Sequence, residues 1–320
     1  MKHFLAFMLM FVTLTACAKN EDHLIASKKT GVVAILAENK DNPNESGVGT
    51  GFFIKDNYIV TNFHVVGDGN YNLKVGMENN DTLYEAEMVV GDKDSDVAVI
   101  KLKDWEKFKK ENPQLTYLKF ATEMPTATDT AWAIGHPWGL FYSISKGIIS
   151  VEGRKSPNPI PTWWIQSDAH IFQGNSGGPL LNENGDVLGI NSVMIAREGG
   201  SYGFAIPFPL VKKIISDLEK YKEVRWANLG ISVETPGVTI KEMMDNGAAK
   251  EFGLKVGDKI VSIKTEETQV TPINQMFDLI AFLSVLDYQT KVQIAVERDG
   301  SMITLDVTPK FKLNSEYATN

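Results

Sequence analysis

Short apolar runs, rich in β-branched and aromatic residues, dominate the sequence from Gly31 to about Tyr221. Examples are GVVAILA, GTGFFI, DVAVIKL and DVLGINSV, and Gly, Pro, Asn and Asp separate them. Such runs with frequent turn residues predict an all-β domain, either a sandwich or a barrel. Within it, Phe52–Val60 predicts a hairpin with a Lys-Asp-Asn turn. Pro209–Tyr221 has the apolar spacing of a closing helix.

A second unit begins near Trp226 with the predicted strand NLGISVE. A short helical stretch at Ala248–Phe252 follows, and then a longer amphipathic helix from about Pro272 to Leu286, with proline where helix entry favours it. The strands KVQIAVERDG and MITLDVTP predict a final hairpin. This order of elements predicts a small α+β domain.

The bulk composition agrees with two globular domains. The chain has 320 residues, and 43% of them are hydrophobic, which is enough for a sizeable core in each domain. The formal net charge of −8 gives no electrostatic reason to expect nucleic acid or an anionic membrane surface as a partner. No cluster of His, Cys and carboxylates has metal-ligand spacing, so neither a metal nor another cofactor is expected.

The N-terminus predicts export. A positive start and an apolar run too short to span a bilayer indicate a secretory signal at residues 1–16. Leu14-Thr15-Ala16-Cys17 resembles the bacterial lipobox, in which the cysteine is acylated; the alternative is a plain signal with a chance cysteine. Cys17 is the only cysteine in the chain, so it forms no internal disulfide, and we favour acylation. Ala18 after it favours the outer membrane, and polar residues 17–30 are predicted to be a tether.

The stretch QGNSGGPLL places one serine, Ser176, among three glycines. Its G-x-S-x-G spacing also fits α/β-hydrolases, but those enzymes place the histidine after the serine, and all five histidines here precede it. The order His, Asp, Ser of chymotrypsin is available in His64, Asp96 and Ser176. The alternatives are a core histidine at 64 and a strand-start cap at 96.

Three segments in this order, TNFHVV, DSDVAVIKL and GNSGGPL, resemble the HtrA family of trypsin-like serine proteases. The likeness extends over GTGFFI, AIGHPWGL and GFAIP, from about Gly31 to Lys312. It implies a mostly β chain: a chymotrypsin-like double β-barrel protease domain at 31–222, an α+β PDZ domain at 226–312 and a tail at 313–320.

The resemblance implies that Ser176 attacks a peptide carbonyl, that His64 moves the proton and that Asp96 orients His64. The oxyanion hole is expected at Gly174, Asn175 and Ser176, with the N–H groups of Gly174 and Ser176 as the donors. The glycines would keep side chains away from these N–H groups.

The sequence around the expected specificity pocket departs from the pattern of the family. SDAHIFQGNS carries His, Phe and Gln at 170, 172 and 173, where relatives have Ala, Asn and Pro. We expect a small or medium aliphatic residue before the cut, and an effect of His170 on that preference. His136, in place of an asparagine, is expected to be structural. The pocket is assigned to His170, Ile171, Ile190, Asn191 and Ser192.

NLGISVE resembles the carboxylate-binding opening of a PDZ domain. The N–H groups of Leu229, Gly230 and Ile231 would receive a peptide's C-terminal carboxylate, and the following strand would pair with the peptide. Met276 and Ile280, four residues apart, would face the groove. Hydrophobic C-termini are therefore the expected partners of this domain.

Together these features predict a lipid-anchored envelope endopeptidase, facing the periplasm, that cuts unfolded or mislocalised proteins and is regulated or fed through its PDZ domain. By analogy with relatives it is expected to be a homotrimer. One alternative is a PDZ-containing binding or chaperone protein with little proteolytic activity. Another is a narrowly specific stress-signalling protease with the same chemistry.

Overall fold

The computed structural model describes residues 21–42, 44–78, 80–137, 142–155, 162–197, 200–234, 236–245 and 247–313. These residues form two compact units, 21–152 with 165–211, and 153–164 with 212–313. The predicted signal, Cys17 and most of the predicted tail lie outside the described residues. Among the described residues, no helix has the length and apolar character needed to cross a membrane.

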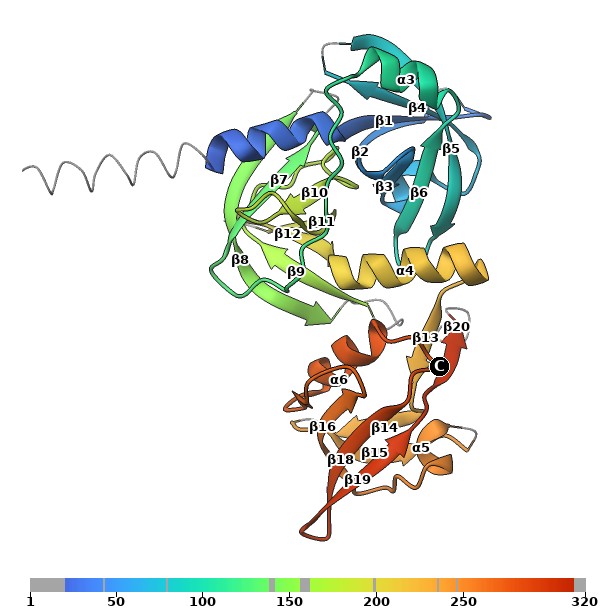
Figure 1. Ribbon diagram of the computed structural model, residues 1–320, viewed down its shortest axis with the longest axis vertical. Helices are drawn as coiled ribbons and strands as arrows, with labels where there is room; N and C mark the ends of the chain where they lie inside the picture. The colour runs from blue at the N-terminus through green and yellow to red at the C-terminus, as the bar shows by residue number, and fades with distance from the viewer. Residues whose placement is uncertain are drawn as a thin grey trace, which may run out of the picture. The chain divides into compact units, whose positions relative to one another are not determined.

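The first closed barrel has the strand order β1-β2-β3-β6-β5-β4 within the described residues (Figure 1). The predicted hairpin at Phe52–Val60 is confirmed: Phe52 lies opposite Val60, and Asn57 takes a left-handed conformation in the turn. The apolar runs fill the barrel, where Ile35, Phe53 and Ile100 are completely buried. Its strands are β1 (Val32–Asn39), β2 (Ser46–Lys55), β3 (Tyr58–Thr61), β4 (Tyr71–Met77), β5 (Asn80–Asp92) and β6 (Val97–Leu102).

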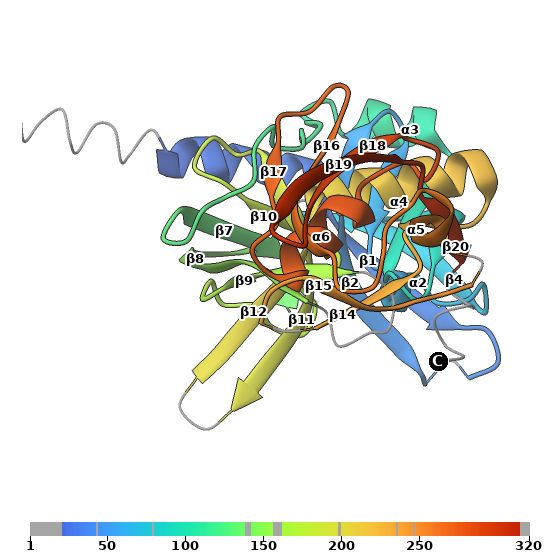
Figure 2. The same ribbon diagram turned by 90° about the horizontal axis from the view of Figure 1, so that it is seen from below.

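The second closed barrel has the order β10-β11-β12-β9-β8-β7 over the residues described. Figure 2 shows its long β11–β12 hairpin extending away from the barrel. These two barrels confirm the predicted double-barrel architecture. The strands are β7 (Thr130–Gly135), β8 (Ser143–Lys155), β9 (Trp163–Ser167), β10 (Pro179–Leu181), β11 (Val187–Arg197) and β12 (Gly200–Pro207).

Short helices connect the strands, and one at the N-terminus was not expected. The helix of residues 21–28 occupies part of the predicted tether, and its Ile25 is buried. Glu21 accepts hydrogen bonds from the second barrel, at 3.0 Å from the Trp132 indole and at 3.2 Å from Lys146. The predicted closing helix is confirmed as α4. The other elements are η1 (Lys29–Gly31), α2 (Phe63–Val66), α3 (Trp105–Glu111) and α4 (Phe208–Tyr221).

The C-terminal region is the predicted α+β domain. A sheet of order β14-β15-β16-β18-β19 has β14 at its edge, and β17 pairs with β16 beside it. Strands β13 and β20 form a separate ribbon. The elements are β13 (Arg225–Asn228), β14 (Ile231–Glu234), β15 (Thr239–Met243), α5 (Ala248–Glu251), β16 (Lys259–Thr265), β17 (Thr271–Pro272), α6 (Met276–Ser284), β18 (Val292–Arg298), β19 (Ser301–Val307) and β20 (Lys310–Leu313).

The long helix of this domain begins later than its proline predicted. Pro272 belongs to β17 and lies opposite Ser262, whereas α6 begins at Met276. Gln275 and Asp278 form a reciprocal capping box at that start. The cap satisfies backbone N–H groups that would otherwise lack partners, and it therefore decides where the helix begins.

Candidate active site

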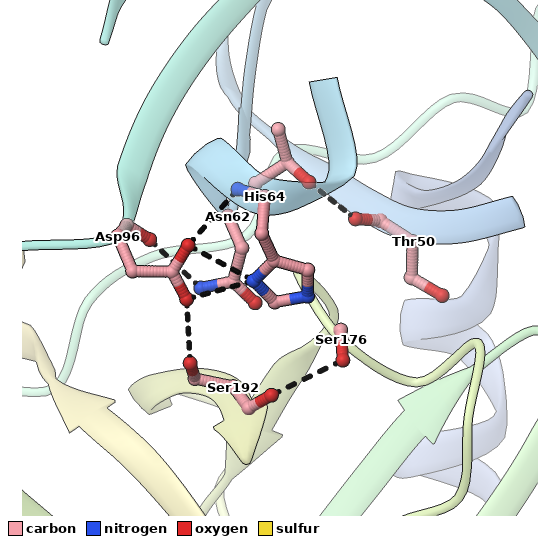
Figure 3. Close-up of polar contacts among 7 residues, drawn as sticks. Thr50, Asn62, His64, Asp96, Ser176 and Ser192 are labelled. Carbon is pink, nitrogen blue, oxygen red and sulfur yellow. Dashed lines mark hydrogen bonds and ion pairs between the residues drawn. The ribbon is translucent and has the colours of Figure 1, made fainter. Parts of the chain in front are cut away.

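His64 lies in the short helix α2, with its ring directed between Asp96 and Ser176 (Figure 3). Nδ1 is 2.9 Å from both carboxylate oxygens of Asp96, and the backbone N–H of His64 donates to Oδ1 of Asp96 at 3.0 Å. Because a carboxylate only accepts hydrogen bonds, Nδ1 carries the proton. The lone pair of Nε2 is therefore left on the side of Ser176.

Asp96 is held from three sides. Its φ of 57° is left-handed, a conformation that costs a non-glycine residue roughly 1–3 kcal/mol unless the surroundings impose it. The side-chain amide of Asn62 donates to the Asp96 carbonyl at 2.9 Å, and the Ser192 hydroxyl donates to Oδ2 at 2.6 Å. With His64, these contacts fix both the backbone and the carboxylate of Asp96.

Ser192 has a role that its predicted place in the specificity pocket did not reveal. The β11–β12 pairing shifts register between Asn191 and Val193, which makes Ser192 the extra residue of a bulge. Bulges redirect side chains. Here the hydroxyl reaches Asp96, and the Ser192 carbonyl accepts the Ser176 hydroxyl at 3.1 Å (Figure 3). GINS contained this residue, but no sequence signal marks the bulge.

The loop before and after Ser176 needs its glycines. Gly174 has a φ of +104°, and a Cβ there would lie 2.5 Å from the His136 carbonyl oxygen. Gly177 has a φ of +85°, and its Cβ would lie 2.0 Å from the carbonyl oxygen of Thr50. Any larger residue at either position would displace the loop.

Two N–H groups of this loop remain available. Asn175 donates its N–H to Phe172 O (2.9 Å) and Gly177 donates to Asn191 O (2.8 Å). Asn175 is therefore not a donor to an oxyanion, contrary to its inclusion in the predicted hole. Among the described residues, the N–H groups of Gly174 and Ser176 meet no protein acceptor. They are the donors that we assign to the oxyanion hole.

The remaining predicted pocket residues differ in exposure. Ile171 is buried, and a Cβ on Gly203 would lie 2.4 Å from its Cδ1. Ile190 and Asn191 are completely buried, and the Asn191 amide donates to Pro179 O at 3.1 Å. His170, by contrast, is exposed. The aliphatic preference and the influence of His170 stay predictions.

His136 lies directly beneath the serine loop and is completely buried. Burial lowers the pKa of its imidazole from 6.5 to about 4, so the ring is neutral at physiological pH. Its backbone N–H donates to the Thr50 hydroxyl at 3.1 Å, and its ring packs 4.9 Å from that of Tyr142. This environment fits the structural role expected for His136.

The predicted peptide-binding residues lie at the start of strand β14 and on helix α6. Leu229 is buried, and Gly230 has a φ of +70° at the start of the edge strand β14, next to half-buried Ile231. Met276 and Ile280 are half-buried on α6. The Gly230 N–H already has an acceptor, because the Asn228 side-chain oxygen lies 2.6 Å away.

Over the described residues, no cluster of three His, Cys, Asp or Glu could hold a metal.

Comparison with known proteins agrees with this geometry. A model of the trypsin-like peptidase domain matches residues 49–190, and a PDZ domain model matches residues 227–308. A crystal structure of the serine endoprotease from Yersinia pestis is 27% identical, with a TM-score of 0.61, and the alignment covers 91% of this chain and 98% of that one. The HtrA-type protease AlgW with tripeptide is 25% identical, with a TM-score of 0.66 and coverage of 91% and 97%.

The chain belongs to the HtrA family of trypsin-like serine proteases. Among HtrA relatives, it is 33% identical over 279 residues to the "Probable periplasmic serine endoprotease DegP-like" of Pseudomonas putida, an alignment covering 82% of this chain and 55% of that protein. It is 33% identical over 270 residues to the periplasmic serine endoprotease DegP of Salmonella typhimurium, covering 78% and 54%. The chain thus spans about half the length of these curated relatives.

Proposed function

We propose that this HtrA-family protein is a periplasmic serine endoprotease that cleaves unfolded or mislocalised proteins, with a PDZ domain that recognises hydrophobic C-termini and regulates or feeds the protease. The observation that carries the proposal is the catalytic geometry. Asp96 holds Nδ1 of His64, Ser176 lies on the side of Nε2, and two N–H groups remain available beside Ser176. A pure binding protein has no reason to keep this arrangement.

The reaction follows from these positions. The Ser176 O–H turns from the Ser192 carbonyl to Nε2 of His64, which takes the proton as Oγ attacks the peptide carbonyl carbon. The N–H groups of Gly174 and Ser176 then stabilise the negative oxygen. His64 returns the proton to the leaving amine, which leaves an acyl group on Ser176. Water, activated by His64 in the same way, releases the acid and restores the serine.

The Asp96 carboxylate and the Ser192 hydroxyl together support the positive charge that develops on His64. As the imidazole becomes positive, the carboxylate 2.9 Å from Nδ1 stabilises it. The Ser192 hydroxyl, 2.6 Å from Oδ2, keeps the carboxylate in the plane that this contact needs. Asp96 therefore orients the base and remains an acceptor throughout the reaction.

The PDZ domain would bind a peptide by extending its sheet. Strand β14 pairs with β15 on one side only, as far as the described residues show, which leaves the other edge for a peptide strand. The carboxylate would meet the N–H groups at Leu229, Gly230 and Ile231, and side chains would pack near Met276 and Ile280. Hydrophobic C-termini suit these apolar side chains.

The decisive experiment uses residues 18–320 and a Ser176→Ala twin. Cleavage of unfolded casein is followed with and without a peptide that ends in a hydrophobic residue. We expect the wild type to cut and the twin to be inactive, and a peptide-dependent rate would make the PDZ domain a regulator. If neither protein cuts although the peptide binds, the binding-protein alternative replaces the protease. Cleavage of one native protein but not of casein would favour the signalling alternative.

We further propose that Cys17 is acylated and anchors the protein to the outer membrane, and that the protein is a homotrimer. The lipobox-like Leu14-Thr15-Ala16-Cys17 supports the anchor. A Cys17→Ala variant should then move from the membrane fraction to the soluble periplasm, and the wild type should incorporate labelled palmitate. Light scattering of the purified protein tests the trimer.

A further inference from the structure

Thr50 is a completely buried residue of β2 that contacts the serine loop from the other barrel. Its N–H donates to the Ser176 carbonyl at 2.9 Å, and its hydroxyl donates to the Gly174 carbonyl at 2.6 Å. One residue therefore binds the loop twice, on both sides of the peptide that carries the Ser176 N–H. Figure 3 shows Thr50 close to the triad, without direct contact between its hydroxyl and His64.

Apart from the two N–H groups assigned to the oxyanion, the backbone groups next to that peptide are also held. The N–H of Asn175 binds Phe172 O, the carbonyl of Asn175 accepts the Gly178 N–H at 2.9 Å, and the Gly177 N–H binds Asn191 O. A peptide unit can turn only if its neighbours allow it, because adjacent units share an α-carbon. The carbonyls of Gly174 and Ser176 are the groups that depend on Thr50.

The hydroxyl proton of Thr50 has one destination. A hydroxyl donates once and accepts twice. Since the proton goes to Gly174 O, the oxygen accepts from the His136 N–H at 3.1 Å and faces Nδ1 of His136 at 3.3 Å. Nδ1 must then carry hydrogen, which makes His136 the Nδ1–H tautomer. Thr50 thereby joins the strand before Pro137 to the serine loop.

We propose that the Thr50 hydroxyl is a positioning group for the oxyanion hole, which holds Gly174 so that the N–H groups of Gly174 and Ser176 point at the negative oxygen. This role rests on the proposed protease function. Thr50 touches neither the substrate nor the reacting atoms, and it acts through the loop. Removing its hydroxyl should therefore weaken stabilisation of the transition state and leave substrate binding nearly unchanged.

The test compares Thr50→Val, which keeps the shape and removes the hydroxyl, with Thr50→Ser, which keeps the hydroxyl. Both are made in the full-length protein, with Thr265→Val as a control that removes a buried threonine hydroxyl from the PDZ domain. The readouts are kcat and KM on casein, and the Ki of a peptide aldehyde ending in valinal. When His64 takes the Ser176 proton, the hemiacetal that this aldehyde forms with Ser176 carries a negative oxygen that the hole would bind.

Losing a direct oxyanion-hole donor lowers kcat about 100- to 1000-fold, so an indirect group should cost less, about 10- to 100-fold. We expect this fall in kcat for Thr50→Val, a parallel rise in the aldehyde Ki and a KM within about threefold of the wild type. Thr50→Ser and Thr265→Val should retain kcat within about threefold. If Thr50→Val does not fold, Thr50→Ala against Thr50→Ser isolates the same hydroxyl.

Three results would overturn the positioning role: an unimpaired kcat in Thr50→Val, an equal loss in Thr50→Ser, or an equal loss in Thr265→Val. In the Ser/Ala comparison, equal kcat values would do the same. A wild type that cuts nothing would instead overturn the proposed protease function, and with it this role. An active wild type with an unimpaired Thr50→Val would overturn the positioning role alone.

Discussion

The serine loop (residues 174–178) and the PDZ loop (residues 228–231) are built alike. Each offers backbone N–H groups beside a glycine with positive φ, Gly174 at +104° and Gly230 at +70°. They differ in what those N–H groups contact. In the described serine loop, the two donors assigned to the oxyanion meet no protein acceptor. In the PDZ loop, the Gly230 N–H donates to the Asn228 side chain at 2.6 Å.

This difference matches the two ligands that we propose. An oxyanion exists only during the reaction, so its donors must be oriented beforehand; reorienting them at that moment would raise the barrier. A peptide carboxylate is a stable partner that can displace another acceptor. Its binding then costs the loss of the Asn228 contact, which lowers the affinity. We therefore expect the serine loop to be preorganised and the PDZ loop to exchange the Asn228 side chain for the peptide carboxylate.

The largest effect is expected from Asp96→Asn, which leaves the PDZ loop untouched. An amide can hold the wrong tautomer of His64, and in trypsin the same change lowers kcat about 10,000-fold, an effect we expect here at similar size. The measurement is cleavage of casein together with peptide affinity, by fluorescence anisotropy. Peptide affinity should stay within about twofold of the wild type, since no residue of the triad is among those assigned to peptide binding. A large change in affinity would contradict the separation of the two sites.

Acid should lower the stability of the protein through His136, which lies beneath the serine loop, and this effect should not involve the PDZ loop. The pKa of His136 is about 4 in the folded protein and 6.5 ordinarily, so the unfolded chain binds the proton more readily. Stability is therefore lost as pH falls from about 6.5 to 4, by about 3 kcal/mol in total, and changes no further below. Residues 226–312 contain no histidine.

His136→Asn is the matched variant, since its amide cannot take up that proton. Urea unfolding between pH 7 and pH 4 should show a smaller loss of stability in the variant than in the wild type. Parallel pH curves for the two proteins would contradict the assignment of this loss to His136.

The smallest effect concerns Asn228. Asn228→Ala frees the Gly230 N–H, and peptide affinity should rise about three- to tenfold, in keeping with one hydrogen bond. Asn228→Asp keeps an acceptor and adds a charge that repels the peptide carboxylate, so affinity should fall. Anisotropy titrations with a peptide ending in a hydrophobic residue measure both. Weaker binding by Asn228→Ala would mean that Asn228 organises the loop instead of competing for it.

The sequence predicted the elements whose signals are local. The hairpin at Phe52–Val60 carries its own turn, and α4 carries its own apolar spacing, so both were predicted closely. Long-range contacts decided the rest. The helix of residues 21–28 is stabilised by Trp132 and Lys146, more than a hundred residues away, and was predicted as a tether. Pro272 suggested a helix start but belongs to a strand.

The candidate site shows the same limit. His64, Asp96 and Ser176 could be named because their order in the chain and their surrounding motifs are distinctive, and the structure brings His64 and Asp96 into contact. The hydrogen bond from the Ser192 hydroxyl to Asp96 depends on a β-bulge. The hydrogen bond from the Thr50 hydroxyl to Gly174 depends on the contact between the two barrels. Neither contact leaves a periodic pattern in the sequence.

The helix of residues 21–28 would also limit the reach of an enzyme anchored through Cys17. Cys17 lies four residues before Glu21 in the sequence, and four residues span at most about 14 Å. If Cys17 carries lipid, the second barrel, which holds Glu21 through Trp132 and Lys146, works directly at the bilayer surface. A protease held there cannot diffuse through the periplasm. Its substrates must reach the membrane or be synthesised there.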